Sequence, residues 1–414
     1  MTPQQSETPA ELEHEGSSAR LRDAHRIVVV RALRGFADGL VSVLLAGYLV
    51  RIGFTPFQVS VLVTGTLLGS AALTMGVGLA AHNVERRPLL LLACALMVFT
   101  GAGFALLTTF WPLLIVAVVG TLNPSAGDVS VFLPMEQAAL ANTTSGPERT
   151  HLFAWYNVAA NLAGAVGALT SVVPAVIAQR YGINLVDAER AGFLVYVTVA
   201  VISSIAYLRL GRSIDTHAAA AAPLARSRSR VLRLTALFTL DSFGGGFVVQ
   251  SLLVLWLYQR FDLSVQAAGT IFFVAGVAGA LSQLLSPILA RRIGLIQTMV
   301  YTHLPANLLL IVAGLAPTAS VAISCLLIRA ALSQMDVPPR QAYVMAVVPP
   351  EERAAAASMT NVPRSLAAAV PPLFVGLMLS HSTVGWPLVC GGAVKVLYDL
   401  LLLLEFRAVP ATQS

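Results

Sequence analysis

The amino-acid sequence predicts an all-α membrane protein in which twelve transmembrane helices form two six-helix bundles. Of its 414 residues, 57% are hydrophobic and only 11% are charged, whereas soluble domains carry roughly 25% charged residues. Apolar stretches long enough to cross a hydrocarbon layer of roughly 30 Å recur along the whole chain. Polar residues also repeat between the two halves at a constant spacing. These observations predict a duplicated membrane bundle.

The repeat joins residues that lie 204 positions apart. It pairs Pro134 with Pro338, Gln137 with Gln341, Glu148 with Glu352, Arg149 with Arg353 and Asn157 with Asn361. A similar spacing relates Asp38 to Asp241. Matched polar residues in an apolar chain indicate two bundles related by an axis along the membrane normal, with a substrate site at their interface.

The spans follow one another in order along the chain. Residues 1–26 are polar and lack the apolar core of a signal peptide, which predicts a cytoplasmic tail. The N-terminal bundle, 27–210, holds predicted spans at about 27–50, 57–81, 89–109, 111–140, 150–178 and 190–210. A small, polar and basic stretch, 211–230, predicts a cytoplasmic linker. The C-terminal bundle, 231–407, holds spans at about 231–258, 266–290, 296–316, 319–347, 353–379 and 388–406, before a tail at 408–414.

The distribution of arginine predicts the orientation in the membrane. Most loop arginines fall on the side that carries both termini and the linker, and the positive-inside rule places that side in the cytoplasm. The net charge of +6 therefore reflects topology rather than nucleic-acid binding. We expect a multi-pass protein of the cell membrane that acts as a monomer.

Three charges lie inside the apolar segment predicted as the tenth span. On a helix that turns about 100° per residue, Arg329, Asp336 and Arg340 point within about 20° of one direction. A charge at mid-membrane costs at least roughly 2.5 to 3.5 kcal/mol, so this stripe should face water or a buried partner. Pro338 and Pro339 cannot continue the hydrogen-bond ladder, which predicts a kink beside these charges.

The loop after the second predicted span resembles that of the major facilitator superfamily. Gly78 to Leu90 reads GLAAHNVERRPLL, which matches the family's G-x-L-A-D-R-x-G-R-R-x-x-L at Gly78, Ala81, Arg86, Arg87 and Leu90. His82 and Glu85 depart from it. The resemblance implies the family's fold and a transporter that works by alternating access. Its gating candidates here are Gly78, Glu85, Arg86, Arg87, Glu148, Arg149, Glu352 and Arg353.

In the fold that this resemblance implies, helices 1, 4, 7 and 10 line a central cavity, and the deep charges of this chain fall on those helices. A carboxylate between apolar walls can load and release a proton. The proton-coupling candidates are Asp38, Asp241 and Asp128. The substrate-cavity candidates are Arg34, Arg329, Asp336, Arg340 and Glu136.

Structural roles remain open for the same residues. Arg34 and Asp38 are one turn apart and could pair, and Asp336 could be held between Arg329 and Arg340. Lys395 and Asp399 are also expected to form an i,i+4 pair. Glu136 and Arg340 occupy equivalent places, so a cross-bundle pair could close the inner gate.

The predicted function is secondary transport of a small organic solute, driven by protons. Arginines along the cavity favour an anionic substrate. Proton-coupled efflux of drugs or cations is the alternative, although the predicted fifth helix, at Asn161 to Leu169, lacks the G-P-x-x-G-G signature that drug/proton antiporters carry there. A membrane sensor on the same fold is a further alternative. No phosphate-binding loop, catalytic constellation or metal-ligand spacing is present in the sequence, so we expect no enzyme activity, cofactor or metal.

Overall fold

The computed structural model describes residues 9–80, 84–125, 130–141, 143, 146–211, 227–349 and 352–406. The elements of the described chain are helices. Those of the N-terminal half are α1 (Pro9–Arg51), α2 (Pro56–Ala80), α3 (Arg86–Leu106), α4 (Phe110–Val119), α5 (Phe132–Ala141), α6 (Gly146–Thr170), α7 (Val173–Tyr181) and α8 (Leu185–Leu208). Those of the C-terminal half are α9 (Arg228–Gly246), α10 (Gln250–Phe261), α11 (Val265–Ile293), α12 (Leu295–Leu315), α13 (Ala319–Ser333), α14 (Val337–Ala346), α15 (Arg353–Ala369), α16 (Pro371–His381) and α17 (Trp386–Phe406).

Twelve spans result when consecutive short helices are joined as α4/α5, α6/α7, α9/α10, α13/α14 and α15/α16. Ten helical stretches of the described chain are long and apolar enough to cross a membrane by themselves. The remaining spans are α1, whose membrane part holds Arg31, Arg34 and Asp38, and the pair of short helices α4 and α5. The twelve-helix prediction is confirmed.

Prolines and glycines decide where the spans break. The predicted kink in the tenth span is confirmed, because α13 ends at Ser333 and α14 opens with Pro338 and Pro339 in its first turn. The prediction of one continuous helix over 111–140 was wrong. Helix α4 ends at Val119 and α5 begins at Phe132, and Pro124 between them cannot serve a helix interior.

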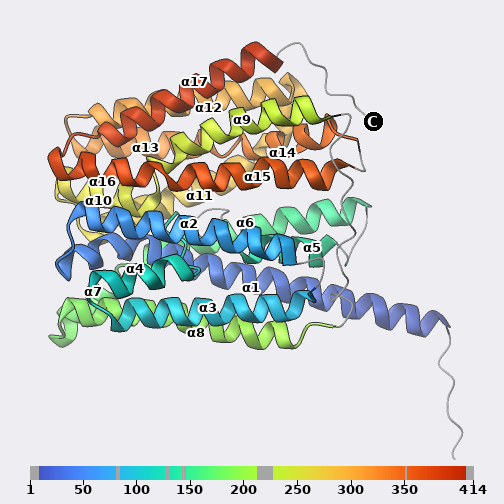
Figure 1. Ribbon diagram of the computed structural model, residues 1–414, viewed down its shortest axis with the longest axis horizontal. Helices are drawn as coiled ribbons and strands as arrows, with labels where there is room; N and C mark the ends of the chain where they lie inside the picture. Colours follow the sequence, from blue (N-terminus) through green and yellow to red (C-terminus); the bar gives the residue numbers. More distant parts are fainter. Residues whose placement is uncertain are drawn as a thin grey trace, which may run out of the picture.

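Helix α1 begins well before the first predicted span. It starts at Pro9 rather than near Ile27, and in Figure 1 it extends beyond the bundle. The Asp23 carboxylate accepts a hydrogen bond from the Gly211 backbone N–H at 2.9 Å, and Arg26 donates to the Arg209 carbonyl at 2.7 Å. The part of α1 around Asp23 and Arg26 is thereby tied to the end of α8. Residues 212–226, most of the predicted linker, lie outside the described chain.

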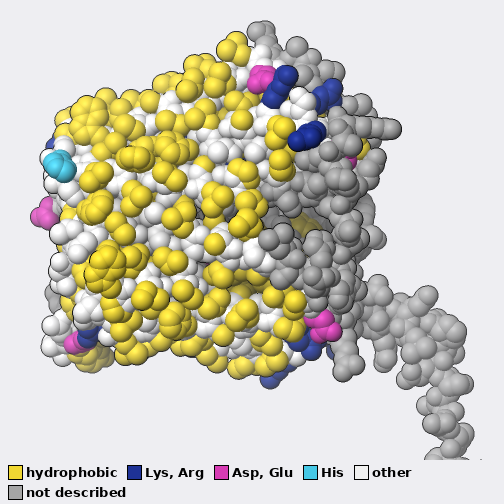
Figure 2. All heavy atoms as spheres, in the orientation of Figure 1, with side chains coloured by type: hydrophobic (Ala, Val, Ile, Leu, Met, Phe, Trp, Pro, Cys, Tyr) yellow, Lys and Arg dark blue, Asp and Glu magenta, His cyan; other side chains and the backbone are white. Residues whose placement is uncertain are grey.

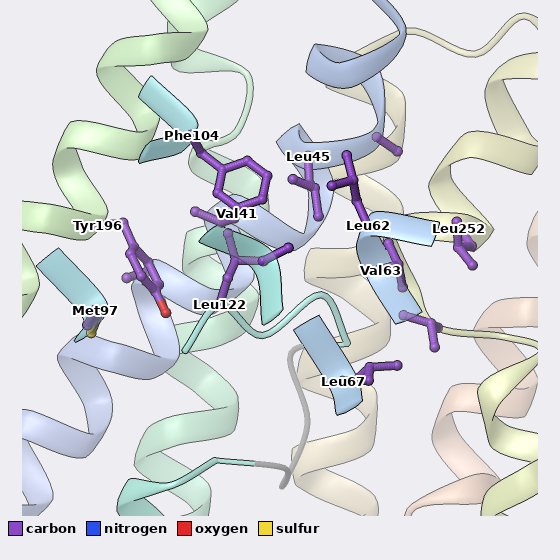
Figure 3. Packing of buried hydrophobic residues seen from close by; sticks show 14 of the residues in the cluster. Val41, Leu45, Leu62, Val63, Leu67, Met97, Phe104, Leu122, Tyr196 and Leu252 are labelled. Carbon is purple, nitrogen blue, oxygen red and sulfur yellow. The ribbon is translucent and has the colours of Figure 1, made fainter. Parts of the chain in front are cut away.

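The two halves lie side by side with their helices running roughly parallel (Figure 1). Contacts between the halves are made by α2 with α15 and α16, by α6 with α11, and by α1 with α10. Figure 3 shows Val41 and Leu45 of α1 and Leu62 and Val63 of α2 in one apolar cluster with Leu252 of α10. One apolar cluster therefore contains residues of both halves.

Several contacts between described residues of the two halves lie toward one end of the bundle. We call the end that carries Leu210, Ser227 and Phe406 the terminal face, and the end that carries the turns after Arg51 and Phe261 the opposite face. Toward the opposite face, Gln250 donates to the Ser42 hydroxyl at 3.0 Å, and the Ser251 N–H donates to the Pro124 carbonyl at 3.1 Å. Gly376 packs against Ser60 there as well. At the terminal face, a separate cluster that includes Val231, Tyr343 and Phe406 belongs to the C-terminal half alone.

The outer surface of the bundle is apolar. Leu404, Leu106 and Trp111 are 81%, 77% and 72% exposed. On the face in Figure 2, hydrophobic side chains form a broad band, and charged side chains and a histidine lie toward its edges. Such a band is stable in lipid and would aggregate in water, so the helices span a membrane.

Substituting Gly39 with alanine is expected to destabilise the N-terminal half. A Cβ at Gly39 would overlap the Gly164 carbonyl oxygen of α6, which is backbone and cannot rotate away. Overpacking of this kind costs about 1–3 kcal/mol. Thermal unfolding of the purified protein measures the effect. Gly76→Ala is the matched control, because a Cβ there meets no atom within 4 Å; equal unfolding temperatures for the two variants would contradict the close approach of α1 and α6.

Candidate functional site

A closed network of polar side chains centres on Glu136 in the N-terminal half. Arg34 of α1 lies 2.5 Å from one carboxylate oxygen of Glu136, which belongs to α5. The hydroxyl of Tyr156 in α6 donates to the same carboxylate at 2.6 Å, and that of Tyr207 in α8 donates at 2.5 Å. Glu136 is fully buried and both of its oxygens are engaged. The network therefore joins four helices.

Arg34 is held on a second side by an aromatic ring. Its guanidinium carbon lies 3.8 Å from the centre of the Phe132 ring, a cation–π contact. Its Nε and Nη1 atoms are buried and make no hydrogen bond. The pairing of Arg34 with Asp38 was therefore wrong, because Arg34 turns to Glu136 instead.

Asp38 makes no hydrogen bond or ion pair with any residue of the described chain. It is half-buried on α1, one turn before Ser42. Because Ser42 bonds to Gln250 of the C-terminal half, and residues four apart share a helix face, Asp38 lies on the face of α1 that is turned toward that half.

A larger network occupies the C-terminal half and centres on Asp241 of α9. Lys395 of α17 lies 2.6 Å from one of its carboxylate oxygens, and Arg340 of α14 lies 3.3 Å from the other. Arg340 also contacts Asp336 at 3.1 Å. All four side chains are buried. The expected contact between Asp336 and Arg340 is confirmed. Arg329 does not pair with Asp336.

The network continues through His303 of α12. Its Nδ1 atom lies 2.9 Å from Asp399 of α17, and its Nε2 atom lies 3.8 Å from Asp241. Asn307 donates to the second oxygen of Asp399 at 2.9 Å. The predicted pair of Lys395 with Asp399 was therefore wrong. Although the two residues are one turn apart, Lys395 contacts Asp241 of α9 and Asp399 contacts His303 of α12. A buried charge pairs with the group that helix packing places closest to it.

The two networks occupy equivalent places in the repeat, but the spans that supply the cation and the anion are exchanged. In each half, an ion pair joins the first span to the fourth. Arg34 supplies the cation and Glu136 the anion in the N-terminal half, whereas Asp241 supplies the anion and Arg340 the cation in the C-terminal half. Glu136 and Arg340 do not contact each other in this structure, since each is buried with a partner from its own half.

Arg329 is the deep cation that stays unpaired. It lies in the middle of α13 and is half-buried, and it makes no ion pair or hydrogen bond in the described chain. Its Nε atom is buried without a partner. The guanidinium interacts electrostatically with Asp241 without contacting it.

A chain of amide side chains crosses between the halves. Asn161 of α6 donates to Gln283 of α11 at 3.1 Å, and Gln283 donates to Gln334 at 3.1 Å. Gln334 lies in the turn between α13 and α14 and is exposed. These neutral groups form a polar bridge that can break at small cost, because amides exchange readily for water.

Two of the gating candidates bond to residues that lie just before and just after the predicted linker. Arg87 donates to the Leu210 carbonyl, and Glu352 accepts hydrogen bonds from the backbone N–H and the hydroxyl of Ser227. Arg86 is buried, whereas Glu85 is exposed and makes no ion pair in the described chain. Asp128 and the side chains of Gly78, Glu148, Arg149 and Arg353 lie outside what the structure describes.

Sequence reasoning missed the residues outside the first and fourth spans of each half. Tyr156, Tyr207, His303 and Asn307 all contact the buried charges. The signal available for the C-terminal half was weak but present: Lys395 is the only lysine of the chain, and His303 and Asn307 are polar residues one turn apart in an apolar helix.

Comparisons with known proteins place this geometry in context. The sequence profile of the Major Facilitator Superfamily matches residues 27–372. A membrane protein of Saccharomyces cerevisiae, itself uncharacterized, is 24% identical over 415 residues, which cover 92% of this chain and 93% of the yeast protein.

Two solved structures share the fold. A bacterial homologue of the human lysosomal transporter Spinster, in an inward-facing and unoccupied conformation, has a TM-score of 0.71 at 14% identity and covers 94% of this chain and 97% of its own. A D-xylose–proton symporter has a TM-score of 0.71 at 16% identity and covers 94% of this chain and 98% of its own. At these identities the likeness concerns the fold alone.

Proposed function

Because the chain belongs to the Major Facilitator Superfamily and serves membrane transport, we propose that it is a secondary transporter that moves a small organic anion by alternating access, driven by protons. The observation that carries the proposal is the unpaired guanidinium of Arg329 in the middle of a membrane-spanning helix. We assign the protein to the cell membrane, with both termini in the cytoplasm.

The environment of Arg329 supports an anionic substrate. An arginine turned toward lipid at this depth would cost at least roughly 2.5 kcal/mol, so its exposed part is expected to face the space between the halves. The other described charges at this depth on the cavity helices, apart from Asp38, already have partners within 4 Å. A planar guanidinium suits a carboxylate or a phosphate, which it binds through two parallel hydrogen bonds.

The contacts between the halves support alternating access. The halves meet at the opposite face through Ser42 with Gln250 and through the apolar cluster of Figure 3. With the terminal face in the cytoplasm, this state is closed to the outside. Neutral hydrogen bonds and apolar packing are weaker than buried ion pairs. The halves can therefore separate at the opposite face when they close at the cytoplasmic end.

Substituting Arg329 with glutamine is expected to weaken binding of the anionic substrate by about 10- to 100-fold, because a hydrogen bond to a charged group contributes about 1.5–3 kcal/mol. The protein is reconstituted in vesicles loaded with a pH-sensitive dye, and a panel of organic carboxylates and sugar phosphates is screened for solute-dependent proton influx.

Arg233→Gln is the matched control, since Arg233 is 64% exposed in a surface pair with Glu405 and such pairs contribute little. An unchanged solute profile in the Arg329 variant would contradict the anion site. Binding of a solute without any flux in the parent would instead support the sensor alternative.

Asp38 favours a second candidate function, the proton-coupled efflux of cations or drugs. It is a deep carboxylate without a contact partner, on the face of α1 that is turned toward the C-terminal half. In the same vesicles, cationic compounds whose flux depends on Asp38 and not on Arg329 would establish this alternative.

A further inference from the structure

The buried charges of the C-terminal half include one negative charge more than their direct partners neutralise. The carboxylates belong to Asp241, Asp336 and Asp399, whereas the cations of the described chain within 4 Å of them are Lys395 and Arg340. Each of these residues is less than one-tenth exposed. An uncompensated buried charge costs several kcal/mol, and Arg329 acts on Asp241 only from a distance, so these carboxylates can accept one more positive charge beside them.

His303 lies where this positive charge is missing. Its ring is 4% exposed and lies between two carboxylates. Its Nδ1 atom lies 2.9 Å from Asp399 and 3.0 Å from the amide nitrogen of Asn307, which also donates to the other oxygen of Asp399. Its Nε2 atom lies 3.8 Å from Asp241. A proton on each ring nitrogen would therefore lie beside a carboxylate.

The groups around His303 come from every helix packed against α12. The rings of His303 and Tyr398 meet edge to face, with their centres 5.9 Å apart. Helix α11 carries ionisable residues only at its last turn. The charged and titratable groups of this environment are Asp241 from α9, Arg329 from α13, Asp336 and Arg340 at the start of α14, and Lys395, Tyr398 and Asp399 from α17.

We propose that His303 is the proton-binding residue of this transporter. The Nε2 lone pair takes one proton from water and releases it to water, and no other bond forms or breaks. The imidazolium, held between Asp399 and Asp241, makes the network neutral. The proposal rests on the proposed function, and it places the proton on α12, outside the helices expected to line the cavity.

The N-terminal network shows why the proton does not belong there. Glu136 is neutralised by Arg34 and accepts two tyrosine hydroxyls, so its charge and its oxygens are already satisfied. Asp241 itself already contacts two cations. His303 instead lies between two carboxylates, where a bound proton offsets their charge.

Arg329 connects the proton to the substrate. Its positive charge interacts with Asp241 and partly offsets the negative excess of the network. An anion bound to Arg329 cancels that charge, which strengthens proton binding at His303. Because coupling between two sites is reciprocal, the proton also strengthens binding of the anion, and the two move together.

The proposal is tested on the purified full chain with isotope-labelled histidine, by following the imidazole resonances in a pH titration. His303→Gln identifies the resonance among the seven histidines, and the exposed His381 of α16 supplies the matched control variant His381→Gln. If His303→Gln does not fold, the His303 resonance is instead identified as the one that moves in Asp399→Asn. We expect Nδ1 to stay protonated throughout and Nε2 to gain its proton as the pH falls.

Two further variants should move this titration in opposite directions. Asp241→Asn removes the anion that faces Nε2, so the proton should bind at least about tenfold more weakly. Arg329→Gln removes the offsetting cation, so it should bind more tightly. A His303 resonance that does not titrate, or that titrates identically in both variants, would overturn the proposal.

Vesicle transport separates this proposal from the function on which it rests. If the parent accumulates an anion in response to a proton gradient and His303→Gln does so with the same pH profile, the histidine is not the proton site although the function stands. If His303 titrates as expected but no solute of the panel moves protons, the transport function fails while the proton site stands.

Discussion

Substituting Asp241 with asparagine is expected to abolish proton-driven accumulation of the substrate while exchange of substrate across the vesicle membrane continues. Asp241 supplies the charge that makes the C-terminal network negative. Without it, Nε2 of His303 no longer lies beside a carboxylate at 3.8 Å, so a proton bound there loses the anion that stabilises it. Accumulation under an imposed pH gradient and counterflow exchange, measured in the same vesicles, distinguish the two processes.

The Asp241 variant needs a control for stability, because the change leaves Lys395 without its carboxylate at 2.6 Å. The double variant Asp241→Asn/Lys395→Met removes both charges and should unfold near the temperature of the parent, since replacing a buried ion pair with apolar groups is often neutral. It should still fail to accumulate substrate. Gradient-driven accumulation equal to that of the parent in either variant would rule out a coupling role for Asp241.

Substituting Glu136 with glutamine is expected to destabilise the protein by about 3–5 kcal/mol, the effect of leaving one charge of a buried pair without its partner. Arg34 would lose the ion pair at 2.5 Å and would have no water to replace it. Reversible unfolding in mixed micelles gives the free energy of unfolding for the parent and the variant.

The matched control for Glu136 removes both charges. Arg34→Met/Glu136→Leu should recover most of the lost stability, because neither charge then remains buried. A Glu136→Gln variant as stable as the parent would show that the network is not what holds α1, α5, α6 and α8 together.

Much of the architecture was predictable because it depends on local composition. The length of apolar runs follows from the thickness of the membrane, and the breaks at Pro338 and Pro339 follow from a missing N–H. The break between α4 and α5 was not predicted, although Pro124 lies within it. A single proline in an apolar run does not reveal whether the helix bends or ends, since that depends on the neighbours available to satisfy the freed carbonyls.

The candidate site was predictable in its residues but not in its pairs. The sequence placed Arg34, Glu136, Asp241 and Arg340 among the deep charges, and all four lie in the two buried networks. The proposed partners were those nearest along the helix. In the structure each charge pairs with another helix, because the energy of a buried charge depends on which groups surround it in space.

Composition, hydropathy and the internal repeat alone established a twelve-helix membrane protein with duplicated halves and charges placed in its interior. Those properties follow from the requirement that each backbone segment satisfy its own hydrogen bonds in lipid, which acts locally along the chain. Tertiary packing alone decided that His303 and Asn307 join Asp399, that Lys395 reaches Asp241, and that Arg329 stays unpaired. Electrostatic partners are chosen by distances of a few ångströms between helices that the order of residues does not specify.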